Sequence, residues 1–193
     1  DTESIQWVLD MQNQHNIPLW CGETGENSNV WYKDAMSLYE TNNIGWSCWP
    51  YKRIATTVAP YSVSSNPNYE AIINFWKGEG PEPSVASAMA GLNQLTDDIL
   101  LENNTFYKDV VDAYLRQPQD NTSIPYAEHT IPGLVYLSDY DLGTNGIAYF
   151  DQDVANYSLS TDQYEAWNRG WTYRNDGVDI QENSDTDNSN GLH

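Results

Sequence analysis

Helix-like and strand-like segments alternate over the first fifty residues of the chain, and this alternation restricts its fold more than any other feature. Residues 3–15 and 30–42 carry apolar side chains at helical spacing, whereas residues 17–22 and 43–49 are short apolar runs typical of buried strands. Short strands that alternate with helices indicate βα units and a parallel sheet. The sequence therefore predicts an α/β fold for this part of the chain.

A change of pattern divides the chain at a polar, proline-containing stretch, residues 117–130. Before it, helices are expected at residues 66–77, 84–101 and 107–115, and Ser84 is expected to cap the second of these. After it, residues 134–140, 147–151 and 171–180 are short runs separated by Gly, Asn and Asp, which is all-β patterning. The predicted units are residues 1–116, a linker at 117–130, and a β-rich unit at 131–193.

Composition limits the partners of the chain. Its formal net charge of −20 opposes binding to nucleic acid or to anionic membrane surfaces, since both require clustered Lys and Arg. The chain has 8 Trp and 14 Tyr against 3 Phe, and flat rings with polar edges can stack on sugars, although core packing explains any single ring as well. A neutral glycan is the partner class that fits both features.

A carboxylate follows the first apolar run directly, in the sequence Gly-Glu-Thr-Gly at 22–25. Active sites of (β/α) barrels are built at the carboxyl ends of the strands, so Glu23 is a candidate catalytic group. The alternatives are a solvated loop carboxylate or a charge at the N-terminus of the following helix. Glu26 could support the catalytic group, but it is expected to interact with the N-terminus of the following helix. The two cysteines, Cys21 and Cys48, are expected to be buried free thiols, because they cannot alone form a disulfide framework or a zinc site.

Together with Gly-Trp-Ser-Cys-Trp-Pro-Tyr-Lys at 45–52, this motif resembles the seventh and eighth strands of glycoside hydrolase family 5. The resemblance covers about residues 1–115 and implies the C-terminal portion of a TIM barrel. It implies that Glu23 is the nucleophile of a retaining β-glycosidase and that Trp49 is a platform under the sugar. Further candidates for substrate contact lie in or beside these motifs: Trp46, Asn27 and Trp31.

The acid/base glutamate of that family, on its fourth strand in an Asn-Glu-Pro context, has no counterpart in this chain. A complete barrel takes about 250 residues, so the rest of the barrel must come from other sequence or another chain. We expect the 193 residues alone to be inactive, because a retaining mechanism needs two carboxyl groups. The chemistry needs no cofactor.

The β-rich part resembles the first half of a family 6 carbohydrate-binding module, most specifically in Tyr-Arg-Asn-Asp-Gly-Val-Asp-Ile at 173–180. The resemblance implies a jelly-roll-like sandwich that stacks glycans on aromatic rings, with Tyr173, Trp167 and Trp171 as candidates. Such modules often hold a structural calcium, but Tyr136 and Ser138 replace the usual glutamates here. The remaining candidate calcium ligands, which a solvated acidic face also explains, are Asp176, Asp179 and Glu182.

Two functions follow as hypotheses. The first is a secreted retaining glycosidase on cellulose, another β-glucan or mannan, with an appended glycan-binding module. The alternative is a non-catalytic glycan-binding or self-assembling extracellular protein, in which open strand edges pair between chains. Neither hypothesis fixes the linkage of the substrate.

Overall fold

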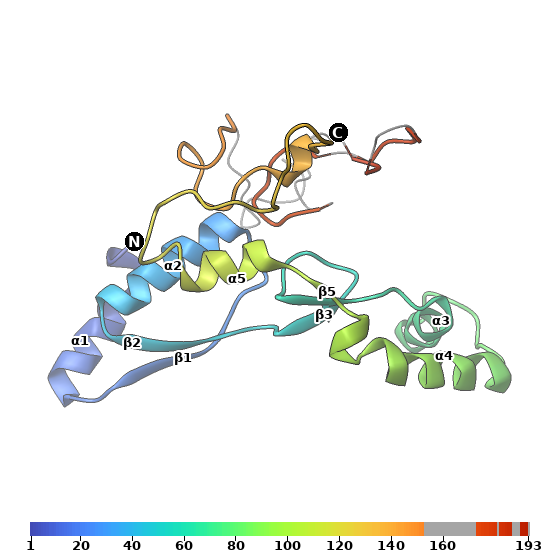
Figure 1. Ribbon diagram of the computed structural model, residues 1–193. Coiled ribbons are helices and arrows are strands. Elements are labelled where there is room, and N and C mark those ends of the chain that lie inside the picture. Colours follow the sequence, from blue (N-terminus) through green and yellow to red (C-terminus); the bar gives the residue numbers. More distant parts are fainter. Residues whose placement is uncertain (153–172, 181, 187–189, 193) are drawn as a thin grey trace.

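A computed structural model describes residues 1–152, 173–180, 182–186 and 190–192 of the chain. It is a mixed helix-and-strand structure with two small sheets, as the alternating pattern predicts (Figure 1). Its elements are α1 (Gln6–His15), β1 (Leu19–Thr24), α2 (Asn29–Thr41), β2 (Ile44–Cys48), β3 (Lys52–Ile54), β4 (Tyr61–Val63), α3 (Pro67–Lys77), α4 (Val85–Asp98), β5 (Thr105–Phe106) and α5 (Lys108–Leu115), with 3-10 turns η1 (Glu3–Ile5), η2 (Leu101–Asn103) and η3 (Leu137–Asp139).

The expected βα unit is present as β1, α2 and β2. The two strands pair in parallel, with Leu19 opposite Ile44 and Thr24 opposite Cys48. Strand β1 starts two residues later than expected and continues to Thr24. Glu23 therefore lies within the strand and not directly after it, because the pairing with β2 resumes at Thr24 after an irregularity at residues 22–23.

The helix starts follow from capping side chains. Ser28, Asn66 and Ser84 each accept a hydrogen bond from the backbone N–H three residues ahead, at the first turns of α2, α3 and α4. The cap expected at Ser84 is thus confirmed. Helix α4 ends at Asp98, before the expected residue 101, and the side-chain amides of Asn103 and Asn104 donate to the carbonyl oxygens of its last turn, at Asp97 and Asp98.

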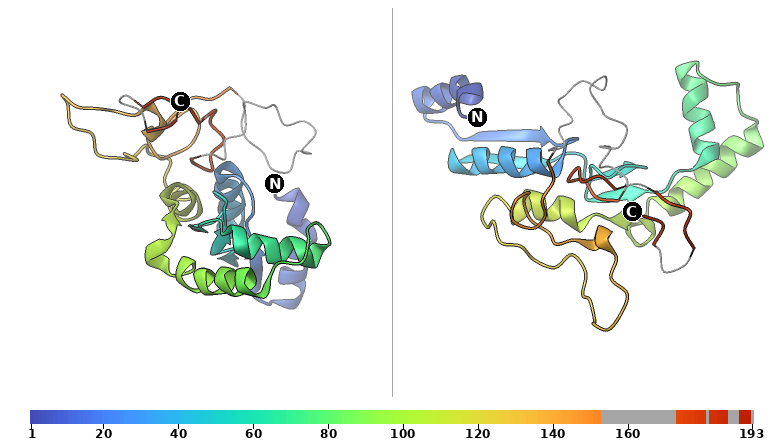
Figure 2. Two further views of the ribbon diagram at one scale, coloured as in Figure 1. Left: turned by 90° about the vertical axis from the view of Figure 1, so that its right-hand side faces the viewer. Right: turned by 90° about the horizontal axis from the view of Figure 1, so that it is seen from above.

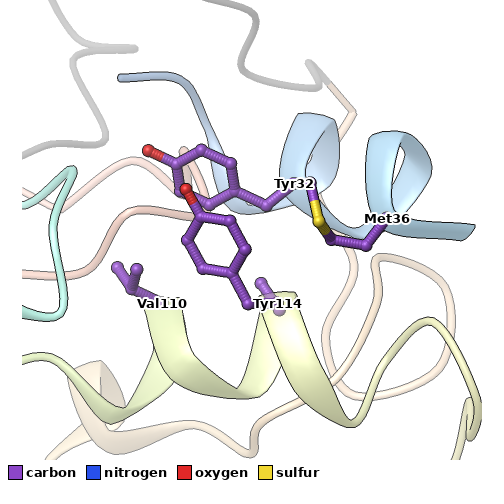
Figure 3. Close-up of a cluster of buried hydrophobic side chains, with 5 residues drawn as sticks. Tyr32, Met36, Val110 and Tyr114 are labelled. Carbon is purple, nitrogen blue, oxygen red and sulfur yellow. The ribbon is translucent and has the colours of Figure 1, made fainter. Parts of the chain in front are cut away.

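The core lies between α2 and α5, which pack side by side over the β1–β2 sheet (Figures 1 and 3). The rings of Tyr32 and Tyr114 stack with their centroids 4.2 Å apart, beside Met36 and Val110. The cysteines are free thiols, as expected, and are partly buried.

The face of the β1–β2 sheet that is turned away from α2 and α5 is not covered by the described residues. Trp20 is 67% exposed, and its ring lies so close over Gly45 that a Cβ there would meet it at 2.3 Å. Parallel sheets are normally covered on both faces. The described part of the chain therefore covers this sheet incompletely.

Strands β3, β4 and β5 form the second sheet, which joins the β1–β2 unit to a hairpin of α3 and α4 at the opposite end of the molecule from α1 (Figures 1 and 2). The apolar stripe expected on α4 exists, but much of it faces solvent: Val85, Met89, Leu92 and Ile99 are exposed. None of the helices described is long and apolar enough to cross a membrane.

The β-patterning expected after residue 130 does not produce strands in the described residues. Residues 134–140 form loop and a 3-10 turn, and residues 147–151 contribute an isolated bridge, Asn145 to Tyr149. Leu137 is 91% exposed, so this run lacks the neighbouring strand that would pair its backbone and bury its alternate side chains. Of the run expected at 171–180, Trp171 lies outside the described residues, and residues 173–180 form no strand.

Candidate functional site

The carboxyl ends of β1 and β2 place Glu23 and Trp49 at one edge of the sheet. The backbone N–H of Trp49 donates to the carbonyl oxygen of Thr24 at 2.8 Å, and the hydroxyl of Tyr114 donates to the same oxygen at 3.1 Å. Glu23 is exposed, and Trp49 is 51% exposed. This edge therefore presents an accessible carboxylate and an accessible ring on adjacent strands, anchored by the buried Thr24.

Gly25 allows the two strand ends to approach this closely. A Cβ built at Gly25 would lie 1.6 Å from the carbonyl oxygen of Trp49 and 2.8 Å from the hydroxyl of Tyr114. The space that a side chain would need is filled by backbone and by a buried ring. Gly25 is thus required by the close approach of protein atoms from the neighbouring strand end and from α5.

The loop that leads from β1 into α2 is fixed by side chains on both sides. The N–H of Asn27 donates to the hydroxyl of Tyr32 at 2.9 Å, and that hydroxyl donates to the carbonyl of Val58 at 2.7 Å. Burial raises the pKa of Tyr32 to about 12, so its hydroxyl stays protonated at neutral pH. Glu26 forms an ion pair with Arg53, in place of the expected contact with the start of α2, where Ser28 is the cap.

A distant segment completes this loop. Asn175 is fully buried, and its side-chain NH₂ donates to the carbonyl of Asn27 at 2.8 Å and to Oδ1 of Asn29 at 3.1 Å. Its backbone N–H donates to Oδ2 of Asp109 at 2.8 Å, and its carbonyl accepts from the N–H of Asn29 at 2.8 Å. One residue from the C-terminal segment thus joins the loop after Glu23 to α2 and α5. We call Asn29, Asp109 and Asn175 the asparagine junction.

Alanine at position 175 should loosen this junction. The partly buried carbonyl of Asn27 and the buried amide oxygen of Asn29 would both lose this donor, at an expected cost of about 2–3 kcal/mol in the free energy of unfolding. Chemical denaturation of Asn175→Ala measures the loss. Asn13→Ala, at an exposed position of α1, is the matched control and should change stability by less than about 0.5 kcal/mol. Equal values for the two variants would contradict the role of Asn175.

The expected calcium ligands have other partners. Arg174, 1% exposed, forms a 2.8 Å ion pair with Asp176, and its guanidinium lies 3.9 Å from the ring centre of Tyr140. The hydroxyl of Tyr140 also donates to Asp176, whereas Asp179 is exposed. Within the described residues no group of three or more His, Cys, Asp or Glu could hold a metal ion. A carboxylate already neutralised by a buried arginine does not fit a calcium site.

Asp109 gives the junction a pH dependence. The pKa of Asp109 is raised to about 6, mainly by burial and also by the like charge of Asp176, although Asn175, Arg174 and Asn29 lower it. Its Oδ1 has no hydrogen-bond partner among the described residues. Because the folded state binds this proton more tightly than the unfolded state, the stabilisation is complete below about pH 4. It is lost as the pH rises through about 6.

Asp109→Asn should remove this dependence. The oxygen of the new amide can still accept the hydrogen bonds from Asn29 and Asn175. Its NH₂ group then takes the position of the oxygen that has no partner. We expect the stability of the native chain to fall, relative to the variant, by about 2–3 kcal/mol between pH 4 and 7. Urea denaturation of both chains at half-unit pH steps measures the difference. Parallel pH profiles would show that Asp109 does not titrate in this range.

The remaining site candidates do not gather at the edge that carries Glu23. Trp46 stacks on Tyr114 with centroids 5.8 Å apart, on the core side of the sheet, and Trp31 contacts Tyr32 edge-on. Tyr173 donates to Asp139 at 2.7 Å, beside Tyr126. Trp167 and Trp171 lie outside the described residues. Asn27 is at the site, but its Oδ1 already accepts from the N–H of Ser28.

Sequence reasoning missed a row of aromatic rings that starts at Tyr51, two residues after Trp49 in the chain. Tyr51 contacts Tyr61 with centroids 5.3 Å apart, and Tyr61 contacts Phe106 at 5.1 Å. Tyr51 is 55% and Phe106 is 50% exposed. We call Tyr51, Tyr61 and Phe106 the aromatic row. The pairing of β4 with β5 brings Phe106 to Tyr61, and no local pattern in the sequence signals that contact.

Comparison with known proteins adds no assignment. The sequence matches no family model and no curated protein, and the structure matches no solved structure.

Proposed function

We propose that this chain belongs to a retaining glycoside hydrolase that acts on a β-linked polysaccharide, and that it supplies the nucleophile, Glu23. The observation that carries the proposal is that Glu23 and Trp49, both exposed, lie at the carboxyl ends of adjacent parallel strands. Catalytic groups of (β/α) barrels occupy this edge. The resemblance of the two strand motifs to glycoside hydrolase family 5 supports the same assignment.

The chemistry divides between this chain and sequence outside it. Glu23 would attack the anomeric carbon and form a glycosyl-enzyme, while Trp49 holds the sugar ring against its face. An acid/base carboxyl about 5–5.5 Å from Glu23 would protonate the leaving oxygen and then activate water. That second group would come from the rest of a barrel, which would also cover the open face around Trp20. We propose that residues 131–193 belong to an appended, secreted glycan-binding module.

The test is an assay of the complete protein on β-glucans, cellulose and mannans, with the anomer of the first product followed by NMR. Retained β-configuration in the first product is the expected result. Release of the inverted anomer would exclude a nucleophilic role for Glu23. No release of reducing ends from any of the polymers would overturn the hydrolase proposal.

A non-catalytic glycan-binding protein is the second candidate, and the aromatic row favours it. The exposed rings of Tyr51 and Phe106, joined through Tyr61 along the β3–β5 sheet, offer stacking surface without any acid or base. Tyr51→Ala and Phe106→Ala should each weaken retention on soluble β-glucan in affinity electrophoresis by about threefold to tenfold. Phe75→Ala, an exposed ring on α3, is the control. Unchanged retention of the row variants would remove the support for this candidate.

A further inference from the structure

A cavity lined by both polar and apolar atoms lies apart from the edge that carries Glu23, between three segments that are distant in the sequence. It has a volume of about 340 Å³ and is bounded by the first turns of α2, by residues 117–121 after α5, and by residues 143–149. Segment 141–151 lies over α2 in Figure 1. This volume is at the lower end of the range for small-molecule sites. We call it the α2 cavity.

The walls of the α2 cavity are held in place independently of any ligand. Ile124 and Leu142 exchange two backbone hydrogen bonds, at 3.0 and 2.8 Å, which fix the third segment against the second. The side chain of Asn145 closes its own loop with bonds to the N–H and carbonyl of Asp151. Asn29, in the floor, belongs to the asparagine junction. A preformed cavity binds with a small ordering cost.

The lining can both donate and accept hydrogen bonds. Within the described part of the chain, the side chains of Asn121 and Thr144, the hydroxyl of Tyr149 and Oε1 of Gln117 have no protein partner, although the NH₂ of Gln117 donates to Asp112. Amides and hydroxyls supply both donors and acceptors. The ring of Tyr149 is fixed by an edge contact with Tyr140, with centroids 5.1 Å apart, and gives the cavity an aromatic wall.

Charge excludes other ligand classes. The charged lining side chains among the described residues are Lys33 and Asp34, which pair with each other at 2.9 Å. An anion would need more positively charged side chains than Lys33, which is already paired, in a chain whose net charge is −20. A hard cation would need several carboxylates, and an apolar ligand would leave the amides without partners.

We propose that the α2 cavity binds one or two units of a neutral sugar, as a second carbohydrate site distinct from the Glu23 edge. Sugar hydroxyls donate and accept in the same way as the lining amides and hydroxyls, and the apolar face of a pyranose fits against the ring of Tyr149. The inference goes beyond the proposed function, because binding in this cavity requires neither Glu23 nor hydrolysis.

Amide chemical shifts of the ¹⁵N-labelled 193-residue chain test the proposal in titrations with glucose, xylose, mannose and cellobiose. At least one probe should give saturable shifts centred on Lys33, Thr144 and Asn145. Thr144→Val, which removes a hydroxyl without changing the shape, should weaken that binding about tenfold. Thr130→Val, in an exposed loop away from the cavity lining, should leave it unchanged.

Separate outcomes would overturn the proposal. Saturable shifts confined to residues 46–52, or lost in Trp49→Ala, would place the sugar at the Glu23 edge. No saturable shift with any of the four sugars would remove the site. Stronger binding of inorganic phosphate at Lys33 would show an anion site in its place. None of these three results would change the hydrolysis expected of the complete protein. Failure of this inference is therefore distinguishable from failure of the proposed function.

Discussion

Glu23→Gln in the complete protein should lower the rate of polysaccharide hydrolysis on the order of 10⁵-fold or more, as loss of a covalent nucleophile does in other enzymes. The amide has the same shape as the carboxylate but cannot attack the anomeric carbon as an anion. Glu23 is exposed at the end of β1, so the substitution should change the free energy of unfolding by less than about 0.5 kcal/mol. Binding to the polysaccharide should therefore persist while turnover is lost.

Glu26→Gln is the matched control, because it makes the same chemical change three residues later, in the loop that follows β1. It breaks the half-exposed ion pair with Arg53, which is worth about 0–1 kcal/mol, and should lower the rate by less than about tenfold. Rates are measured as reducing ends released from β-glucan, with binding followed in parallel. Substantial hydrolysis by Glu23→Gln would reject the nucleophile assignment, and a larger loss in Glu26→Gln would transfer the catalytic role to that residue.

Local patterns in the sequence predict the elements that position Glu23 and Trp49. The parallel pairing of β1 and β2 follows from the alternation of helical and strand-like segments, and Ser84 caps α4 because a short hydroxyl side chain satisfies a free N–H at a helix start. Each of these features involves residues that are close in sequence, or two strands joined by one helix. Propensity and periodicity describe interactions of this range well.

Tertiary contacts account for what the sequence did not reveal. Asn175 and Asn27 are bonded across 148 positions, and neither residue belongs to a periodic pattern. A similar limit explains the wrong prediction of strands at 134–140 and 147–151. Alternating apolar residues favour a strand only where a neighbouring strand pairs with its backbone. Among the described residues after position 130, this pairing is limited to isolated bridges. The pairing of Arg174 with Asp176 likewise redefined a segment that the sequence had suggested for calcium.

Gly25→Ala should cost about 3–5 kcal/mol in the free energy of unfolding, a larger loss than for any other substitution considered on grounds of stability. The added methyl group would lie 1.6 Å from the carbonyl oxygen of Trp49, and a backbone atom at this distance is not a flexible neighbour that can move aside. The hydrogen bond from Trp49 to Thr24 holds the two strand ends at this separation. Relief of the clash therefore requires that bond to break, together with the one from Tyr114.

Gly78→Ala separates the steric cause from a general intolerance of glycine replacement. Gly78 ends α3 with φ 77°, and nothing lies within 4 Å of the position that a Cβ would take there, so alanine costs only the left-handed conformation, about 1–2 kcal/mol. Thermal and urea denaturation compare the two variants. If Gly25→Ala is no more destabilising than Gly78→Ala, the strand ends can separate easily, and Trp49 is not held beside Glu23 by the backbone. If it is much more destabilising, the close approach at Gly25 fixes the backbone of Trp49 against the end of β1, and the geometry of this edge depends on that glycine.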